Sequence, residues 1–573
     1  MVIQPHTLPA EEEISTFGFH SSGSLPSPEK ELMDERALRC NRLAFYAIFS
    51  IAAVTAVITA AFLCPITVPI AIAGGSAGAG LVSEVAFKVI RYRKICKTAG
   101  MIFNHESLLK FRAPEGRCDM LPTRDCAETL EWRKRLIASA EHNIVISGNY
   151  CGDKEFIQLL DAIEQRLEEV PGLEVVIISS PKFLKKNHHK KMNKLRNTYG
   201  GQFSLVQSPD IWHISPGVKK ATNHTKVTVV DYGRRFILGG SGIKTSFSGT
   251  GLFDAAQPTT SRVDGYGIHG MLERILPGHF RDEDFIGESP IGRDTLGTQL
   301  YTQSLLLAHR WQSYNSQIKG LEKTGLVAEE LALLGAENPS RPQAGDTLTT
   351  KLLKTPVPPD LDMPSLPEFA RDPRRTENIR MKILSQGPQD SKSTFARELL
   401  KQFANAHTEI VISHMYFHPS QEIFDALVAA ANRGVRITIL TNGVYPGSPK
   451  SHDFFAPRNR YNYIALRNAV LPEFQDNISV YEFTQPKRGF HKKIVVVDRE
   501  TVIAGSSNFG YKSLVTTSDD EINFTAKSRG FAKEVLETFE TDVRHSTEVD
   551  DFTLTADVTR SAFIHRFLAP LIG

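Results

Sequence analysis

The fold of this chain is decided by a short stretch that occurs twice. The first copy reads NHTKVTVVD (residues 223–231), and the second reads FHKKIVVVD (residues 490–498). In each copy a histidine and a lysine two positions apart lead into an apolar, largely β-branched run, which is typical of a buried strand. Side chains alternate between the faces of a strand, so the histidine and the lysine of one copy point the same way. The pairs are His224 with Lys226, and His491 with Lys493.

The sequence around both copies is also duplicated. HNIVISGNY (residues 142–150) resembles TEIVISHMYF (residues 408–417), and a helical pattern and a second apolar run follow each. The offset is nearly constant, at 266 residues from Ile144 to Ile410 and 267 between the two motif histidines. Strands that alternate with helices predict an α/β fold, and the constant offset indicates one ancestral unit that was duplicated.

We therefore expect two pseudosymmetric sheet-and-helix units, a first unit over residues 130–310 and a second unit over residues 376–545. Between them, residues 337–375 contain NPSRPQ and PVPPDLDMPSLP, and this proline content predicts a long surface linker. At 573 residues the chain has ample material for a large core.

The front of the chain predicts a transmembrane helical hairpin over residues 39–97. Residues 43–63 contain no charge, and their 21 positions are about the length that crosses a bilayer as a helix. Residues 66–83 form a second uncharged stretch, which is shorter and rich in glycine. Basic residues on both flanks place both ends on the cytoplasmic side. The alternative is a buried helical hairpin in a soluble protein. Residues 1–38, rich in Ser, Pro and Glu, are predicted to be disordered.

The amino-acid composition excludes fewer classes of function than the motifs do. The chain has 67 basic and 64 acidic residues, and a net charge of +3 does not by itself indicate a nucleic-acid partner. All six cysteines lie in the first 151 residues, with no CxxC pair and no zinc-like spacing. We therefore expect reduced thiols, rather than a disulfide framework or a structural zinc site. Cys40 and Cys96 flank the hairpin, so acylation is an alternative for these two.

Two imidazoles and two ammonium groups that converge on one pocket would suit a phosphodiester. One histidine can attack phosphorus while the other protonates the leaving alcohol. The lysines can neutralise the charge that develops on the non-bridging oxygens, so no metal and no cofactor are required. Both half-sites lie in one chain, so a monomer is sufficient for a complete site.

These motifs, HTKVTVVD with GGS and HKKIVVVD with GSSN, resemble the two HKD motifs of the phospholipase D superfamily. The resemblance covers roughly residues 130–545 and implies a duplicated fold with one shared active site. It implies a covalent phosphohistidine that water or another alcohol resolves, with His224 more often the nucleophile and His491 the acid. The catalytic residues are then His224, Lys226, Asp231, His491, Lys493 and Asp498.

The second motif matches the family pattern fully. Its histidine, lysine and aspartate are followed by Gly505, Ser506 and Asn508. Glu521, further along, resembles the family's acidic residue that supports an active-site histidine. The first motif departs from this pattern. Its spacing from aspartate to glycine is longer, and Gly242-Ile243 falls where Ser507-Asn508 would align. We predict that Asp264, in SRVDGYG, is the counterpart of Glu521. The residues predicted to bind substrate are Ser241, Ser506, Asn508, Glu521 and Asp264.

The superfamily includes phospholipases, cardiolipin and phosphatidylserine synthases and nucleases, so the motif does not name the diester. The hairpin and the basic segment at residues 181–196 favour a phospholipid at an anionic membrane surface, although a solvated helix face also explains that segment. A hairpin before an HKD body also resembles the membrane-anchored phospholipase D-like proteins of chlamydia-type bacteria. We expect a multi-pass membrane protein whose catalytic body faces a cytosol, on a bacterial inner membrane or, for a chlamydia-type effector, on a host-facing membrane.

The sequence thus predicts a membrane-anchored phosphodiesterase that cleaves or transfers phosphatidyl groups, as a hydrolase or a cardiolipin-synthase-like phosphatidyltransferase. Two alternatives stay open. A phosphodiester nuclease would use the same lysines on a nucleic-acid backbone, although we do not expect nucleic acid as the partner. A catalytically silent membrane scaffold would be expected to lose a member of the His and Lys quartet, and all four are present.

Overall fold

The computed structural model describes residues 114–208, 221–252, 279–322 and 347–559, with short gaps at 293, 359–360, 389, 391, 444–449, 486–487 and 557. These residues belong to one compact body. The predicted disordered segment, the predicted hairpin and Asp264 lie outside them. Within the described ranges, no helix combines the length and the apolar character that a bilayer crossing needs.

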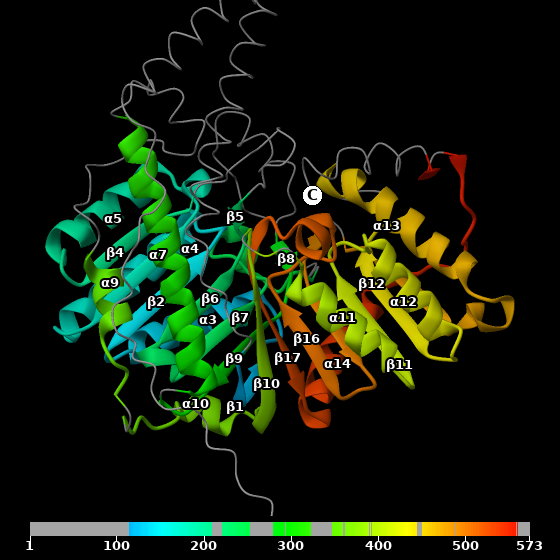
Figure 1. Ribbon diagram of the computed structural model, residues 1–573, viewed down its shortest axis with the longest axis horizontal. Coiled ribbons are helices and arrows are strands. Elements are labelled where there is room, and N and C mark those ends of the chain that lie inside the picture. Colours follow the sequence, from blue (N-terminus) through cyan, green and yellow to red (C-terminus); the bar gives the residue numbers. More distant parts are fainter. Residues whose placement is uncertain are drawn as a thin grey trace, which may run out of the picture. The chain divides into compact units, whose positions relative to one another are not determined.

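A mixed sheet runs through the body, and its two halves repeat the same strand order (Figure 1). The antiparallel pair β1·β10 lies at the centre. From there the order is β9-β7-β6-β2-β3-β4 on one side and β17-β16-β15-β11-β12-β13-β18 on the other. We use "first unit" from here on for β1 to β9 with their helices, and "second unit" for β10 to β18 with theirs.

The strands of the first unit in this sheet are β1 (Glu115–Pro122), β2 (Asn143–Gly148), β3 (Glu174–Ser179), β4 (Phe203–Gln207), β6 (Lys226–Val230), β7 (Arg235–Gly239) and β9 (Asp284–Glu288). Those of the second unit are β10 (Thr376–Gln386), β11 (Glu409–His414), β12 (Arg436–Asn442), β13 (Ile478–Phe483), β15 (Lys493–Val497), β16 (Thr501–Gly505), β17 (Asp519–Lys527) and β18 (Ser546–Glu548).

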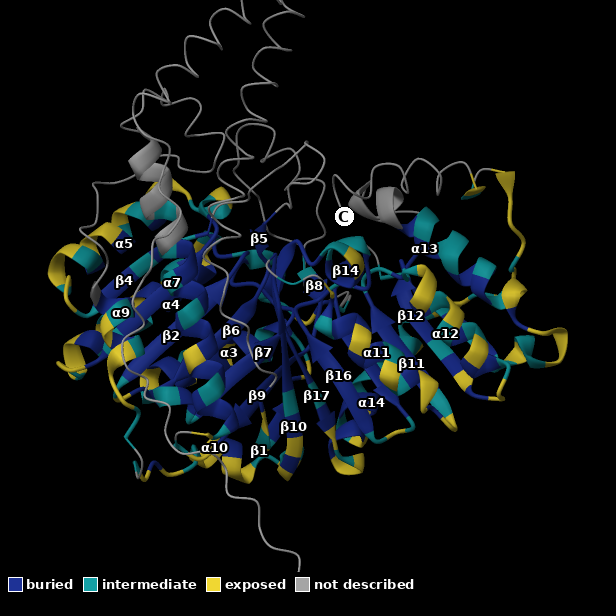
Figure 2. Ribbon diagram, in the orientation of Figure 1, coloured by how far each residue is buried: buried dark blue, intermediate teal, exposed yellow. Residues whose placement is uncertain are grey.

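Runs of valine and isoleucine form the middle strands of each half because both faces of the sheet are covered. β2 pairs in parallel with β3 and antiparallel with β6, and β11 pairs in the same way with β12 and β15. Figure 2 shows these strands buried, while the outer helices alternate between buried and exposed residues. Continuous apolar runs are expected where a strand is buried on both faces. The expectation of an α/β fold is confirmed.

Helices cover the sheet in corresponding places in the two units. The core of the first unit joins α3, α4 and α5 to its parallel strands, and that of the second joins α11, α12 and α13 to β11, β12 and β13. The long helices α7 and α14 each pack against strands of both units. The helices are α3 (Cys126–Ser139), α4 (Asp153–Glu169), α5 (Lys186–Thr198), α7 (Leu296–Glu322), α9 (Thr347–Lys354), α10 (Pro367–Arg371), α11 (Thr394–Ala404), α12 (Gln421–Ala431), α13 (Lys450–Ala469) and α14 (Arg529–Arg544).

The proline-rich segment at residues 337–375 contains two of these helices, α9 and α10. Leu352 of α9 and Phe369 of α10 are buried. The Phe369 ring lies edge-on to Trp132 of α3, with 6.3 Å between ring centroids. The described part of this segment therefore packs against the first unit.

Two short strands connect the units reciprocally. β5 (Thr222–Asn223) of the first unit pairs with the start of β17 in the second. β14 (Arg488–Phe490) of the second unit pairs with β8 (His279–Arg281) of the first. Each short strand comes directly before a motif histidine, so the reciprocal pairing sets both histidines against the opposite unit.

Candidate active site

Each motif histidine is held by the backbone of the other unit. The His224 N–H donates to the Asp520 carbonyl at 3.0 Å, and the His491 N–H donates to the Arg281 carbonyl at 2.8 Å. In the two strand pairings Asp520 lies opposite Asn223, and Arg281 lies opposite Phe490. The two histidines therefore occupy equivalent positions, as the spacing of the motifs predicts.

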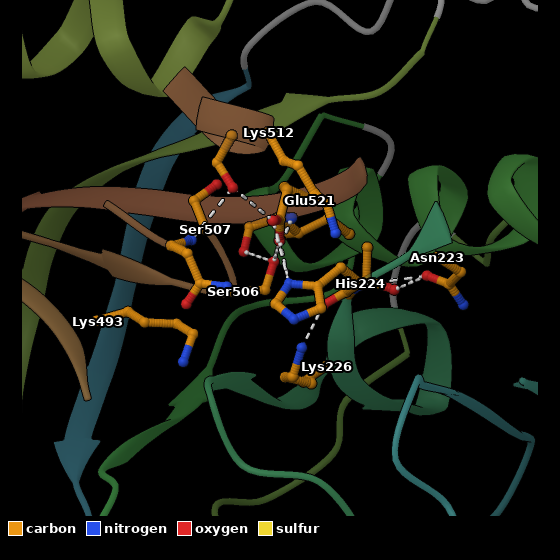
Figure 3. Close-up of polar contacts among 12 residues, drawn as sticks. Asn223, His224, Lys226, Lys493, Ser506, Ser507, Lys512 and Glu521 are labelled. Carbon is orange, nitrogen blue, oxygen red and sulfur yellow. Dashed lines mark hydrogen bonds and ion pairs between the residues drawn. The ribbon is translucent and has the colours of Figure 1, made fainter. Parts of the chain in front are cut away.

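Each imidazole also meets a carboxylate from the opposite unit. His224 Nδ1 lies 3.1 and 3.2 Å from the two oxygens of Glu521, and His491 Nδ1 lies 2.6 Å from Asp282 Oδ2 (Figure 3 shows the first pair). A carboxylate at Nδ1 holds a proton there and leaves the Nε2 lone pair free. This arrangement needs both units, so neither half of the chain contains a complete site.

Asp282, not Asp264, is the counterpart of Glu521. Asp282 follows Arg281 just as Glu521 follows Asp520, and it contacts the equivalent histidine. Asp264 lies outside the described residues. A signal for the right position was present in the sequence, because DEDF (residues 282–285) resembles EINF (residues 521–524). Its meaning depends on the strand register between the units, which the sequence does not reveal.

The residue before each supporting acid is fixed to a long helix of the opposite unit. Asp520 pairs with Arg310 of α7 and accepts a hydrogen bond from Trp311 Nε1 at 2.9 Å. Arg281 donates from Nε to Asp542 Oδ1 of α14 at 2.6 Å. These buried ion pairs fix the residues next to Glu521 and Asp282. The residue before the acid is an aspartate in the second unit and an arginine in the first, so the two ion pairs have opposite polarity.

Both motif lysines fold back onto their own motifs. Lys226 Nζ donates to the His224 carbonyl at 2.6 Å, and Lys493 Nζ donates to the His491 carbonyl at 2.7 Å. Lys493 Nζ also lies 3.0 Å from His491 Nδ1 and 3.3 Å from Nε2. Both lysine residues are only 2 % exposed. Figure 3 shows Lys226 and Lys493 on different sides of the His224 ring, with Glu521 on another side. A small anion near the two rings would be within reach of both ammonium groups.

Burial governs the protonation of this cluster. It lowers the pKa of His224 and of His491 well below the usual value, with further lowering from the nearby lysines, so both rings are neutral near pH 7. Burial also lowers the pKa of Lys226 to about 7 and that of Lys493 to about 8. On the acidic side, burial raises the pKa of Glu521 to about 7 and that of Asp282 to about 6. A bound phosphodiester would favour the charged lysines, because it brings an opposite charge close to them.

The structure places Asp231 and Asp498, which were predicted to be catalytic, at backbone contacts away from the two motif histidines. Each aspartate follows a five-residue strand, so it lies at the opposite end of that strand from its histidine. Asp231 accepts two backbone N–H groups just before β2, at 2.8 Å each. Asp498 accepts backbone N–H groups where β11 begins, from Thr408 at 2.8 Å and Glu409 at 3.1 Å. These carboxylates anchor loops.

The loop after β16 brings three polar residues to Glu521 and its neighbours. Ser506 Oγ donates to Glu521 Oε2 at 2.5 Å, and Ser513 Oγ donates to Oε1 at 2.9 Å. The Ser507 N–H donates to Asn523 Oδ1 at 2.9 Å. The side-chain oxygen of Asn508 is buried and accepts no hydrogen bond within the part of the chain that the structure describes. Ser506 thus contacts Glu521 directly, while the Asn508 N–H donates to Ser513 Oγ at 3.2 Å.

In the first unit the equivalent loop is shifted by one residue from the predicted alignment. The Ser241 N–H donates to Asp284 Oδ1 at 3.1 Å, as the Ser507 N–H does to Asn523. Ser241 therefore corresponds to Ser507, and the positions of Ser506 and Asn508 are taken by Gly240 and Gly242. A Cβ atom at Gly240 would lie 2.7 Å from Asp282 Oδ2, so this position has no room for a side chain while Asp282 contacts His491.

The surroundings of the two histidines differ. The Phe247 and Phe280 rings lie with their centroids 5.0 Å from that of His491. Phe280 lies opposite Gly489 in the pairing of β8 with β14, and Asp519 lies opposite Thr222 in the pairing of β17 with β5. Phe280 near His491 therefore corresponds to Asp519 near His224. One imidazole thus has an aromatic wall and the other an acidic neighbour, so the duplicated site is chemically asymmetric.

Part of the charge in the basic segment at residues 181–196 is neutralised by α4. Lys191 of α5 pairs with Asp161 and Glu164, and Lys194 pairs with Glu164 at 2.8 Å. Lys185 lies 3.0 Å from Asp153. Trp212 and His213, which follow this region, lie outside the described residues.

The family match to known proteins lies in the second unit. The family model described as "Cardiolipin synthase, PLD-like domain" matches residues 399–543, which contain the second motif and Glu521. The body also resembles the crystal structure of phosphatidylserine synthase from Haemophilus influenzae Rd KW20, with a TM-score of 0.50 at 12% identity. That match covers 82% of this chain and 98% of the other, and it shows the fold. Residues 399–543 thus match a PLD-like domain, the domain type that the two motifs predicted.

Curated relatives that match part of this chain include cardiolipin synthases of two bacteria. Cardiolipin synthase A of Pseudomonas aeruginosa strain LESB58 is 30% identical over 186 residues, which are 32% of this chain and 34% of that protein. Cardiolipin synthase of Staphylococcus aureus strain Mu50 is 27% identical over 192 residues, 33% of each chain. This chain thus spans about a third of the length of the curated relatives it matches. The resemblance to chlamydia-type proteins stays a prediction.

Proposed function

We propose that this chain is a phosphatidyltransferase of the phospholipase D superfamily that works like a cardiolipin synthase and is anchored to a membrane by residues 39–97. The observation that carries the proposal is the reciprocal support of the two histidines, in which Glu521 contacts His224 and Asp282 contacts His491. It supplies two imidazoles, each with a carboxylate at Nδ1, beside two lysines. A double displacement at phosphorus requires one ring to attack in its neutral form and the other to carry a proton for the leaving alcohol.

In the first step His224 Nε2 attacks the phosphorus of a phospholipid, and the bond from phosphorus to the head-group oxygen breaks. Glu521 stabilises the positive charge that develops on the ring through its contact with Nδ1. His491, protonated on Nε2 when the anionic substrate is bound, gives that proton to the leaving alcohol. The products of this step are the free head-group alcohol and a phosphatidyl group on His224.

In the second step His491, now neutral, takes a proton from the incoming hydroxyl group. That oxygen attacks phosphorus, the bond from phosphorus to Nε2 breaks, and His224 is regenerated. With phosphatidylglycerol as donor and acceptor the products are cardiolipin and glycerol, and with water as acceptor the product is phosphatidic acid. Throughout both steps Lys226 and Lys493 neutralise the non-bridging oxygens.

The preference for a lipid over a nucleic acid is supported by the matched domain and by the names of both curated relatives. The uncharged stretches at residues 43–63 and 66–83 add to it, because a hairpin would keep the catalytic body within reach of lipid head groups. The ion pairs between α5 and α4 leave less free charge in the basic segment for binding nucleic acid.

The test is a substrate panel on the purified full chain in detergent. It comprises vesicles of phosphatidylglycerol, vesicles of phosphatidylcholine, and single-stranded DNA, each with and without a chelator. We expect cardiolipin and glycerol from phosphatidylglycerol, with turnover that survives the chelator and is lost in both His224→Ala and His491→Ala. DNA cleavage with inert lipids would overturn the proposal in favour of a nuclease.

A further inference from the structure

The carboxylate of Asp519 lies beside His224 and Glu521, and the proposed reaction does not use it. The nitrogen of His224 and one carboxylate oxygen each from Asp519 and Glu521 lie within 4.8 Å of one another, and all three residues are buried. Nitrogen and carboxylate oxygen are ligands that Zn²⁺ and neighbouring first-row ions bind readily. Three ligands around one point also leave a fourth position for water, as in many zinc sites.

Asp519 gives an independent sign of a missing cation. The residue is 4 % exposed, and within the described residues its Oδ1 atom accepts no hydrogen bond. A buried carboxylate oxygen without a partner is costly and is expected to bind water, a proton or a metal ion. The same carboxylate contributes an oxygen to the cluster with His224 and Glu521, so two further ligand atoms lie near this incompletely paired group.

We propose that His224, Asp519 and Glu521 form an inhibitory site for a divalent transition-metal ion of the Zn²⁺ type. The inhibitory part of this inference rests on the proposed function, and the binding part does not. Atoms that bind zinc tetrahedrally at about 2.0–2.1 Å are about 3.3 Å apart. The distances of 3.1 and 3.2 Å from His224 Nδ1 to the Glu521 oxygens already match this edge.

Metal binding would switch off the nucleophile by changing the imidazole tautomer. A neutral imidazole has one N–H and one lone pair. When the ion takes the lone pair of Nδ1, the single ring proton is transferred through solvent to Nε2. Nε2 then has no lone pair for attack on phosphorus. No bond within the protein is broken, so removal of the ion restores the active tautomer.

The site is confined to one side of the pseudosymmetric centre. Beside His491 the position of Asp519 is occupied by Phe280, which offers no ligand atom. The ammonium groups of Lys226 and Lys493 lie close to the cluster and repel a cation. We therefore expect reversible binding, weaker than that of a structural zinc site.

The experiment measures Zn²⁺ binding to the full chain in detergent by competition with a chromogenic chelator, with no lipid substrate present. Wild type is compared with Asp519→Asn and with the control Asp476→Asn, whose side chain is 98% exposed. Other histidines and the cysteines also bind zinc, so the relevant quantity is the difference between variants. We expect Asp519→Asn to lose one equivalent, or to bind it at least tenfold more weakly, while the control matches wild type.

Inhibition is then measured with phosphatidylglycerol vesicles, relative to the zinc-free turnover of each variant. Zinc should inhibit wild type, a chelator should reverse this, and the half-inhibitory concentration should rise at least tenfold in Asp519→Asn. Equal zinc binding by wild type and Asp519→Asn would overturn the proposed site, whether or not the protein turns over lipid. If Asp519→Asn does not fold by circular dichroism, His224→Gln takes its place in the binding experiment, where an unchanged stoichiometry and affinity would equally overturn the site. Loss of binding with unchanged inhibition would overturn the inhibitory role.

Discussion

His491 of the second unit has its Nδ1 atom 2.6 Å from Asp282 of the first unit, while His224 of the first unit contacts Glu521 of the second. Each unit therefore provides a histidine for itself and a carboxylate for its neighbour. This exchange explains why the duplicated motifs are useful only together, because the tautomer of each imidazole is set from across the interface.

The role of Asp282 is tested by comparing it with the position that the sequence alone suggested. Asp282→Asn removes the charge that stabilises protonated His491, so we expect kcat to fall by about 10²–10⁴-fold. Asp264→Asn is the matched control, and its kcat should stay within about twofold of wild type. Steady-state assays with phosphatidylglycerol vesicles measure both. The reverse pattern would restore Asp264 as the counterpart of Glu521.

The aspartates that end the two motifs should affect stability more than catalysis. Asp498→Ala leaves the backbone N–H groups of Thr408 and Glu409 without their partner, so we expect the free energy of unfolding to fall by about 1–3 kcal/mol. Urea titrations measure this loss, and kcat at a temperature where the variant is folded should stay within a few-fold of wild type. A 10³-fold loss of kcat in a folded variant would contradict the structural role.

The fold could be predicted from the sequence because the patterns that indicate it are local and occur twice. The apolar runs that became β2, β6, β11 and β15 are visible in any short window, and the constant offset shows that they belong to one repeated pattern. The convergence of His224 and His491 follows from the duplication. The buried free thiols of Cys118, Cys126 and Cys151 also agree with the expected reduced cysteines.

What the sequence did not reveal depends on register between distant strands. Asp282 is identified only by the pairing of β8 with β14, and these strands are about two hundred residues apart. The one-residue shift that matches Gly240 to Ser506 arises because the turn between β6 and β7 is one residue longer than that between β15 and β16. Motif spacing also could not separate the loop-anchoring Asp231 and Asp498 from the catalytic residues.

The pH dependence of kcat/KM should be bell-shaped with a maximum near pH 7. As pH falls, Glu521 and Asp282, with pKa values of about 7 and about 6, gain protons and no longer stabilise a cationic imidazole. As pH rises, Lys226 and Lys493, with pKa values of about 7 and about 8, lose the protons that bind the phosphate anion. Lys226→Arg should move the alkaline limb upward, because Lys226 loses its proton first and a guanidinium group keeps its proton. A flat profile from pH 6 to 9 would contradict this assignment.

A buried charge cluster between the units should make a large contribution to stability. Lys492 Nζ lies 2.6 Å from Glu283 of the first unit and 2.5 Å from Asp542 of the second. Lys492→Met leaves two buried carboxylates with Arg281 as the cation that still contacts Asp542, so we expect a loss of about 3–5 kcal/mol in the free energy of unfolding. Lys533→Met, on the exposed face of α14, is the control and should change it by about 0.5 kcal/mol or less. Equal effects in urea titrations would contradict the importance of the cluster.

The asymmetry of the glycine-serine loops gives a further test. Gly240→Ser copies the second unit into the first, but its Cβ atom would lie 2.7 Å from Asp282 Oδ2. We expect the side chain to displace Asp282 from His491 and to lower kcat by at least about tenfold. Gly172→Ser, where an added Cβ atom would meet nothing within 4 Å, serves as the control. An active Gly240→Ser enzyme would show that the contact of Asp282 with His491 is dispensable.

The most direct test of the shared site is mass spectrometry of enzyme quenched in base after mixing with phosphatidylglycerol, since phosphohistidine is stable to base. We expect a phosphatidyl group on the peptide that contains His224, and we expect it to be absent from His224→Ala. We also expect the adduct on His224 to accumulate much more slowly in Asp282→Asn. Asp282 and His224 belong to the same unit, but Asp282 acts through His491 of the other unit. Turnover without an adduct on either motif histidine, or unchanged adduct formation in Asp282→Asn, would contradict a single site built by both units.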